Sequence, residues 1–341
     1  MKKWMPAALA ATLALAAGSA LAQTKLLFST FFPPQHPLVK QVLGPWATSV
    51  QQATGGSVVV EFSPTSLAPP PGQLDMVSKG IADVTVQFAG VVPNRLTSIL
   101  VTEVPGPVST SEAMSVALWR THDKYFAKAD EHKGVKLLSV FALPPQGFYG
   151  TRDELIASGE QLKSAKIATT PGTAARAYGA VTSGVVAGPA ARYFELVSKG
   201  MVDAYVAVTP LDVMAFNLAR YTKNGMNLPG LGTAGSFSLV MNEAKWNALK
   251  PAEQAAIAKV SGEAFARSMA TMDVANKAAI KSLQDQGVKF VEAPALLVQD
   301  LGKAFAFVEK EWIAEVGKRG IDGAAAAAFY RAEQKRAGAG Q

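Results

Sequence analysis

The chain has 341 residues and no cysteine, and its 33 Lys and Arg exceed its 26 Asp and Glu to give a formal net charge of +7. A chain of this length exceeds what one hydrophobic core usually organises, which favours two domains. The positive charges are dispersed, which argues against a nucleic-acid or lipid surface, and the lack of thiols excludes disulfides, lipid-modified cysteines and thiolate metal sites.

The first 22 residues predict a secretory signal peptide. Two lysines precede an apolar stretch over residues 5–17, and the sequence Ala20-Leu21-Ala22 ends the segment. The apolar stretch is shorter than the roughly 18 to 20 residues that a membrane span requires. We therefore expect cleavage after this segment and a mature periplasmic protein that begins at Gln23, with full secretion as the alternative.

The mature chain opens with a strand, a helix and a second strand. Residues 25–29 predict a short buried strand that ends at a pair of prolines. Apolar residues at four-residue spacing over 38–50 predict a helix closed by two glycines, and the β-branched residues of 58–62 predict the second strand. This order favours a right-handed crossover in a mostly parallel sheet.

One sequence pattern occurs twice, at residues 74–84 and 194–204. Each copy predicts a helix that ends at a left-handed glycine, Gly80 or Gly200, and is followed by a strand that enters the core. Chance reuse of a common helix end is the alternative explanation. Two copies at domain-sized spacing instead favour two domains of similar topology.

The rest of the chain supplies the connections between these domains. Residues 135–141 predict a strand, and we expect the chain to cross between the lobes near 144–149 and again near 232–238. The helical periodicity of residues 251–286 predicts a helix long enough to reach across both lobes. A terminal helix that includes residues 324–328 is expected to fray.

The predicted fold is therefore α/β, with two lobes, mixed sheets flanked by helices, and a long helix that spans both lobes. Lobe 1 comprises residues 23–146 with a return segment at about 236–286. Lobe 2 comprises residues 147–235 with C-terminal helices at about 287–335.

No sequence motif supports an enzyme. The three histidines, His36, His122 and His132, form no metal-ligand pattern, and we expect them at the surface or at helix caps. The nucleophile elbow, the phosphate-binding loop and the full dinucleotide fingerprint are all missing from the sequence. We expect no metal, no cofactor and no catalysis.

Ligands of open α/β sheets bind outside the carboxyl ends of the strands. The strands that follow the two repeats place Gln87, Phe88 and Tyr205 near such ends. We therefore expect Phe88 and Tyr205 to approach each other across a cleft between the lobes.

With these elements in place, the sequence resembles the extracytoplasmic solute-receptor subunits of TRAP transporters over nearly the whole mature chain. The matching segments are Phe32-Pro33-Pro34-Gln35-His36-Pro37, Thr54-Gly55-Gly56, Leu162-Lys163-Ser164-Ala165-Lys166-Ile167, Gly200-Met201-Val202-Asp203, Tyr221-Thr222-Lys223 and Leu239-Val240-Met241-Asn242. The resemblance implies a type II-like periplasmic binding protein, monomeric, that closes around a solute. It also implies delivery to a small and a large membrane subunit that use an ion gradient.

The sequence departs from the family where the ligand is usually held. Family receptors mostly bind organic acids through an Arg that follows Lys-x-x-Lys-Ile, and Ala168 occupies that position here. The polar residues that follow Asp203 in the family are replaced by mostly apolar ones such as Tyr205 and Ala207. A pocket with fewer charges and more rings favours a small organic acid with an aromatic or apolar body.

Arg152 is the nearest candidate for the missing cation, with backbone donors or a neutral ligand as alternatives. The expected ligand-binding residues are Phe31, Gln87, Phe88, Phe148, Tyr149, Arg152, Ala168, Thr170, Tyr205, Ala207 and Phe237. Competing hypotheses for the whole protein are a receptor for an ATP-driven importer, a periplasmic enzyme on the same scaffold, and a sensory role. No nucleic-acid partner is expected.

Overall fold

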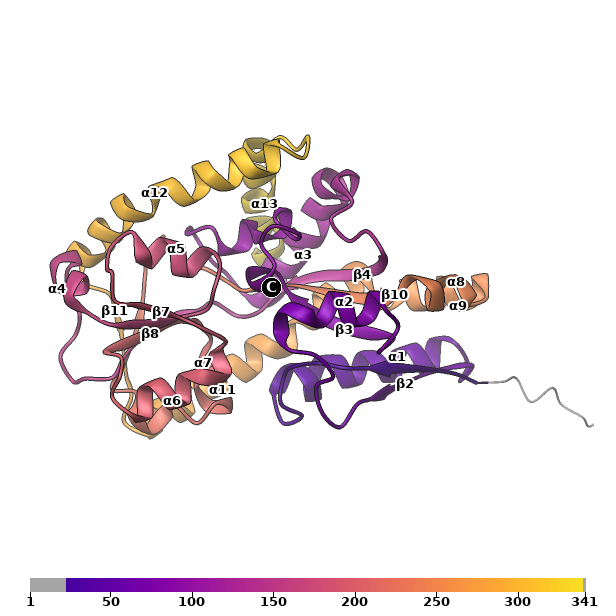
Figure 1. The fold of residues 1–341 in the computed structure, drawn as a ribbon, viewed down its shortest axis with the longest axis horizontal. Coiled ribbons are helices and arrows are strands. Elements are labelled where there is room, and N and C mark those ends of the chain that lie inside the picture. The colour runs from indigo at the N-terminus through magenta and orange to yellow at the C-terminus, as the bar shows by residue number, and fades with distance from the viewer. Residues whose placement is uncertain (1–22, 340–341) are drawn as a thin grey trace, which may run out of the picture.

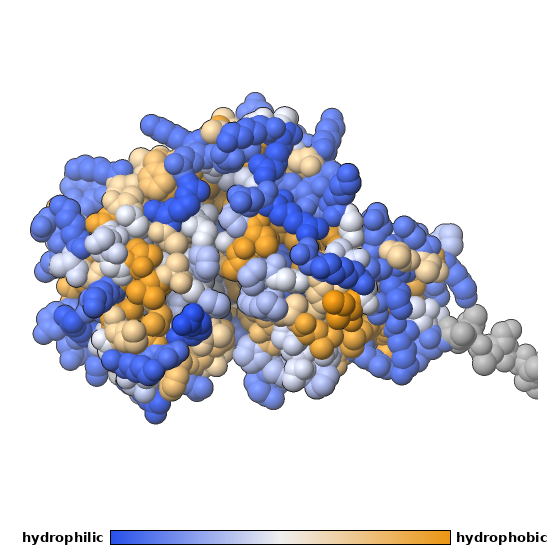
Figure 2. All heavy atoms as spheres, viewed as in Figure 1, coloured by the Kyte–Doolittle hydropathy of each residue, from blue (hydrophilic) through white to orange (hydrophobic). Residues whose placement is uncertain are grey.

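The computed structural model describes residues 23–339, and in it the chain forms two lobes, each built on its own sheet (Figure 1). The expected signal peptide lies outside the described residues. Seen from the same side, the surface is hollowed between the lobes, with hydrophobic residues beside the hollow and hydrophilic residues over the outer faces (Figure 2).

The sheet of the first lobe has five strands in the order β2-β1-β3-β10-β4. Its strands are β1 (Thr24–Phe28), β2 (Val58–Phe62), β3 (Val84–Phe88), β4 (Val135–Ala142) and β10 (Ser236–Asn242). Strand β1 is parallel to both β2 and β3, as the strand, helix, strand order predicts, whereas β10 is antiparallel to both of its neighbours.

The sheet of the second lobe has six strands in the order β11-β9-β5-β8-β6-β7. Its strands are β5 (Gly147–Gly150), β6 (Ile167–Thr169), β7 (Val185–Ala187), β8 (Ala204–Val208), β9 (Asn224–Asn227) and β11 (Lys289–Glu292). The chain passes between the sheets from β4 to β5 and returns from β9 to β10. The first crossing leads into β5 and the second into β10. Each of these strands is antiparallel to its neighbours in a sheet whose other pairs are mainly parallel.

Helices cover both sheets. They are α1 (Gly44–Ala53), α2 (Gln73–Ser78), α3 (Ser111–Thr121), α4 (Gly159–Ser164), α5 (Thr173–Gly179), α6 (Tyr193–Ser198), α7 (Pro210–Ala215), α8 (Glu243–Ala248), α9 (Pro251–Lys259), α10 (Gly262–Ser268), α11 (Ala270–Asp285), α12 (Ala295–Gly317) and α13 (Gly323–Gly338). Among residues 23–339, none of these helices combines the length and the apolar character that crossing a bilayer requires.

The repeated sequence pattern forms the same unit in each lobe. Helices α2 and α6 end at Gly80 and Gly200, which have φ angles of 71° and 62°, and strands β3 and β8 follow them. In each copy, an aspartate at the start of the strand accepts a hydrogen bond from a backbone N–H of the neighbouring parallel strand. Asp83 Oδ2 accepts from the N–H of Leu27, and Asp203 Oδ2 accepts from the N–H of Lys166, both at 2.8 Å.

The helix predicted over residues 251–286 is three helices, α9, α10 and α11, so this prediction was wrong. The chain turns at Gly262, which has a φ of 56°, and a Cβ there would lie 2.9 Å from the ring of Trp119. The last of the three, α11, still reaches across both lobes, since Met272 lies in the core of the first lobe and Leu283 in the core of the second. A longer helix that also spans both lobes is α12. Its first half places Leu297 and Leu301 in the core of the second lobe, and its last turns place Trp312 in the core of the first lobe.

The terminal helix α13 is docked on the first lobe rather than frayed. The guanidinium of Arg120 on α3 donates to Glu263 on α10 at 2.8 and 2.9 Å and to the buried Glu333 on α13 at 2.9 Å. This ion-pair network joins three helices, and Tyr330 is buried beneath them. The helix is therefore held by both apolar and charged contacts.

The histidines also differ from the expectation of surface positions. His132 is buried and its Nε2 lies 2.7 Å from the hydroxyl of Ser238, and burial lowers the pKa of its ring to about 3. His122 is half-buried beside it, and burial lowers the pKa of that ring to about 4. Both histidines are packing residues of the first lobe.

Glu103 is a buried carboxyl at the base of β10, and it generates a prediction about stability. It accepts hydrogen bonds from the hydroxyl of Ser236 at 2.9 Å and from its N–H at 3.3 Å, and burial raises its pKa to about 7. Because the folded pKa exceeds the unfolded value of 4.5, the proton stabilises the fold below about pH 4.5. This contribution is lost as the pH rises through 7.

We expect the wild-type protein to lose about 1 to 3 kcal/mol of unfolding free energy between pH 5 and pH 8 through this group. The variant Glu103→Gln cannot ionise and should show a flatter profile over the same range. Urea unfolding at several pH values measures both curves. Parallel curves for the two proteins would contradict the prediction.

Candidate functional site

A cavity of about 380 Å³ lies between the two lobes, and residues of both lobes line it. The first lobe contributes the loop after β1, the end of β3 and the start of β10. The second lobe contributes the segments that follow β6 and β8 and the turn that precedes α6. The cavity therefore lies outside the carboxyl ends of parallel strands, where ligands of such sheets bind. Its size falls within the usual range for small-molecule sites, about 300 to 1,000 Å³.

Phenylalanine rings form the wall on the side of the first lobe. Phe31 and Phe32 stack with centroids 4.5 Å apart, and Phe88 stacks on Phe237 at 5.1 Å. Phe32 and Phe237 lie 5.7 Å apart and join the two pairs. This wall offers flat apolar surfaces, which favour a ligand with a ring or another apolar body.

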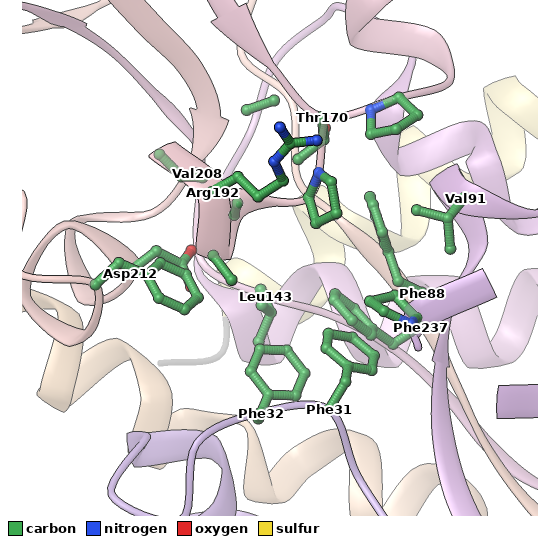
Figure 3. A pocket seen from close by; sticks show the side chains of 18 of the residues that line it. Phe31, Phe32, Phe88, Val91, Leu143, Thr170, Arg192, Val208, Asp212 and Phe237 are labelled. Carbon is green, nitrogen blue, oxygen red and sulfur yellow. The ribbon is translucent and has the colours of Figure 1, made fainter. Parts of the chain in front are cut away.

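Charged side chains lie on the opposite side of the cavity, on the second lobe (Figure 3). Among residues 23–339, those that line the cavity are Arg192 and Asp212. Asp212 is buried in the first turn of α7 and accepts hydrogen bonds from the N–H of Thr209 at 2.8 Å and from its hydroxyl at 2.7 Å. The carboxylate therefore caps α7 while it faces the cavity.

Arg192 immediately precedes α6 and extends toward Thr170 across the cavity (Figure 3). Within the described part of the chain, no carboxylate lies within ion-pairing distance of its guanidinium. Arg192 thus provides a positive charge without an ion-pair partner at the edge of a mainly apolar cavity that also holds the Asp212 carboxylate, although it lies near enough to Glu195 to help lower the pKa of that carboxyl. An anion that enters the cavity can pair with it through two parallel hydrogen bonds.

The sequence predicted part of this site. The predicted residues that line the cavity are Phe31, Phe88, Thr170, Ala207 and Phe237. Ala207 adopts a left-handed conformation with a φ of 60°, and its carbonyl accepts a hydrogen bond from the Gln146 amide at 3.0 Å. Such backbone strain is common at binding sites, where the surrounding structure maintains it.

The expected meeting of Phe88 and Tyr205 does not occur. Tyr205 is fully buried inside the second lobe, where it stacks on Tyr149 with centroids 5.0 Å apart. Its hydroxyl forms a short hydrogen bond with Thr222. Phe88 lies in the first lobe against Phe237. The prediction failed because alternate strand residues point to opposite faces, and Tyr205 points into the core of its own lobe.

Four other predicted residues are buried structural groups that do not line the cavity: Gln87, Phe148, Tyr149 and Ala168. Gln87 accepts a hydrogen bond from the N–H of Leu74 at 3.1 Å and so fixes the start of α2. Phe148 and Ala168 are fully buried in the second lobe. The position that usually carries the ligand arginine is therefore part of the core here.

Arg152 lies outside the cavity. Its side chain is 70% exposed and forms an ion pair with Asp203, the aspartate that ends the second repeat. It lines a separate surface hollow on the second lobe. Since its charge is already compensated far from the phenylalanine wall, the structure gives no support to Arg152 as the replacement for the missing arginine.

Sequence reasoning missed Arg192 and Asp212, and Arg192 lies two residues before the second copy of the repeat. The segment before α2 lines the cavity with Pro69 and Pro70, and the equivalent segment before α6 lines it with Pro189 and Arg192. The two repeats thus present their helix-entry segments to the same cavity from opposite lobes. Among the described residues, no three histidine, aspartate or glutamate side chains gather in a way that could hold a metal ion.

Comparisons with known proteins place this geometry in context. The family model for bacterial extracellular solute-binding protein, family 7, matches residues 28–315. A Comamonas testosteroni protein named outer membrane transporter protein TsaT is 35% identical over 327 residues, which cover 96% of each chain.

Solved structures agree with this family match. A TRAP periplasmic solute binding protein from Bordetella bronchiseptica, with bound (R)- and (S)-mandelate, has a TM-score of 0.86 and 29% identity, covering 92% of this chain and 99% of that one. A TRAP solute binding protein from Rhodoferax ferrireducens, with copurified benzoate, has a TM-score of 0.83 and 23% identity, covering 92% and 98%. The comparison with the Rhodoferax ferrireducens protein shows a shared fold only.

The two lobes touch beside the cavity, and this contact generates a prediction. Gly172, at the start of α5, has a φ of 88°, and a Cβ there would lie 2.3 Å from the carbonyl oxygen of Gly90 in the first lobe. We expect Gly172→Ala to lower the unfolding free energy by about 1 to 3 kcal/mol, through strained backbone and a clash. Urea unfolding measures this loss.

Gly179→Ala is the matched control, because Gly179 lies in the same helix and a Cβ there meets nothing within 4 Å. The control substitution should be neutral or slightly stabilising. Equal stability of the two variants would show that the lobes do not pack this closely at Gly172.

Proposed function

This chain belongs to bacterial extracellular solute-binding protein family 7, the solute-binding subunits of TRAP transporters, and we propose that it captures a small aromatic carboxylic acid. The lobes close around the acid, and the loaded protein delivers it to the small and large membrane subunits of an ion-gradient-driven transporter. Closure is a population shift toward the state in which both walls contact the ligand.

The observation that carries this proposal is one arginine without an ion-pair partner in a cavity whose opposite wall is aromatic. The guanidinium of Arg192 has no carboxylate partner among the described residues, and the opposite wall consists of stacked phenylalanines. A carboxylate at Arg192 would place an attached ring against this wall. The chemistry of the two walls thus matches the two ends of an aromatic acid.

Relatives of similar structure support the ligand class. The Bordetella bronchiseptica protein binds mandelate, and the Rhodoferax ferrireducens protein was purified with benzoate. Both compounds join one carboxylate to one aromatic ring. We assign the same ligand class to this chain because its own cavity offers one cation and several rings.

Our proposal also covers the protein's location and assembly. We propose that the protein acts as a periplasmic monomer after removal of residues 1–22. Its two moving bodies are residues 23–146 with 236–286 and the docked helix α13, and residues 147–235 with β11 and the first half of α12. The protein binds its ligand without chemical change, as its family and the bound acids of its structural relatives indicate. Turnover of a bound acid by the purified protein would contradict this last point.

Arg192→Gln tests the proposed ligand contact. We expect this variant to bind mandelate or 3-hydroxybenzoate at least about tenfold more weakly than the wild type, a loss of about 1.4 kcal/mol. The reason is that glutamine keeps one hydrogen-bond donor group but removes the charge and the bidentate geometry. Isothermal titration calorimetry measures the affinities, after a thermal-shift screen of aromatic acids with the wild-type protein.

Arg152→Gln is the matched control, because Arg152 is an exposed arginine of the same lobe that lies outside the cavity. Its affinity should stay within about twofold of the wild type, as expected for an exposed ion pair. A loss in Arg152→Gln with none in Arg192→Gln would reverse the assignment of the two arginines.

A further inference from the structure

Asp212 has an acceptor oxygen that the protein does not fully use. Both strong hydrogen bonds to this carboxylate, from the N–H and the hydroxyl of Thr209, go to Oδ2. The partner of Oδ1 is Nε2 of His36, at the longer distance of 3.3 Å. Since a carboxylate can accept about four hydrogen bonds, Oδ1 retains acceptor capacity, and Asp212 lines the cavity.

His36 contributes a hydrogen bond to Asp212 from the other lobe. Its Nδ1 accepts a hydrogen bond from the N–H of Leu38 at 3.1 Å, which places the ring proton on Nε2. The ring therefore donates to Asp212 through Nε2. No lysine or arginine of the described chain lies within ion-pairing distance of this carboxylate.

The side chain of Asp212 is only 9% exposed, so water solvates it poorly once the cavity is filled. A buried carboxylate with an unfilled acceptor position is costly unless a donor reaches it. A carboxylate can only accept, so a ligand atom beside Oδ1 must carry a hydrogen. An ether oxygen or a second carboxylate at the same place would be repelled.

We propose that Asp212 is a specificity residue that accepts a hydrogen bond from a hydroxyl or amino group of the ligand. The preferred ligands are then aromatic monocarboxylic acids that carry such a donor, rather than their unsubstituted parents or dicarboxylates. This inference rests on the proposed function, since it takes Arg192 as the carboxylate partner and adds a second contact on the same wall.

Helix capping alone does not account for Asp212. Both capping hydrogen bonds from Thr209 use Oδ2, so Oδ1 takes no part in the cap. The cap fixes the rotamer of the carboxylate and so positions Oδ1 in advance. A site built to bond a ligand donor rejects analogues that lack it far more strongly than an apolar site does.

The first experiment compares ligands on the wild-type protein by calorimetry. Two matched pairs differ by one hydroxyl, mandelate against phenylacetate and 3-hydroxybenzoate against benzoate. In at least one pair we expect the hydroxylated acid to bind at least about tenfold more tightly. The methyl ether of that acid, which keeps the oxygen but loses the hydrogen, should bind no better than the unsubstituted acid. Near-equal affinities in both pairs, or an ether that binds as well as the alcohol, would overturn the proposal.

The second experiment repeats the better pair on Asp212→Asn. Asparagine keeps one oxygen for the cap at Thr209 and presents an amide donor in place of the free acceptor. We expect the preference for the hydroxylated acid to fall below about threefold and the ether to gain affinity. Each preference is the ratio of two ligand affinities measured on the same protein. A partial loss of stability in the variant therefore affects both affinities alike and leaves the ratio unchanged. If the variant does not fold, the ether series on the wild type decides alone.

Asp203→Asn is the matched control, because Asp203 is a partly buried aspartate of the same lobe outside the cavity. Its hydroxyl preference should equal that of the wild type. A preference for the hydroxylated acid that persists in Asp212→Asn would show that another group accepts the hydrogen bond from the ligand hydroxyl. If acids bind more weakly to Arg192→Gln but show no preference for a hydroxyl, this inference alone is contradicted. If the loss of Arg192 leaves their affinity unchanged, the proposed function is contradicted as well.

Discussion

The close contact between the backbones of Gly90 and Gly172 sets how near the two lobes can approach, and the cavity depends on that separation. One lobe supplies the phenylalanine wall and the other supplies the charged wall, so neither wall is a binding site alone. A side chain at Gly172 would meet the Gly90 carbonyl before the walls were close enough to hold a small ring between them. Two residues without side chains therefore determine the width of the site.

The cavity also limits which charged groups a bound ligand can carry. An isolated charge taken from water into an apolar space is too costly unless a partner meets it. Arg192 offers such a partner to one anion, while Asp212 is already held by Thr209 and His36. The phenylalanines provide burial but cannot satisfy a polar group. The site thus combines one strong attraction with broad apolar contact, and its discrimination must come from a few polar atoms.

The sequence predicted the lobes' strands and the repeat well, because these depend on local patterns. The β-branched run of 58–62 became a strand, and Gly80 and Gly200 both took left-handed conformations. A single long helix was wrongly predicted, because residues 251–286 keep helical periodicity across the break at Gly262. That break depends on packing against Trp119, which is distant in sequence.

The charged side of the site was harder to predict for a related reason. Tyr205 was chosen because it follows the start of a predicted strand, but strand alternation buries it in the second lobe. Arg152 was chosen as the nearest replacement for the arginine missing at Ala168, but it forms an ion pair with Asp203. His36 and Asp212 are 176 residues apart and meet only in the folded protein. No local pattern marks such a pair, since their contact exists only once both lobes are in place.

The repeat has an evolutionary consequence. Each copy fixes its own lobe through an aspartate that binds the neighbouring strand, whereas the short segments that enter α2 and α6 carry the cavity residues. In one copy this segment presents prolines, and in the other it presents an arginine. Because these segments are single 3-10 turns outside both sheets, mutation can change what they present without altering a strand. A duplicated architecture of this kind can acquire new cargo by altering one wall while the other still holds the ring.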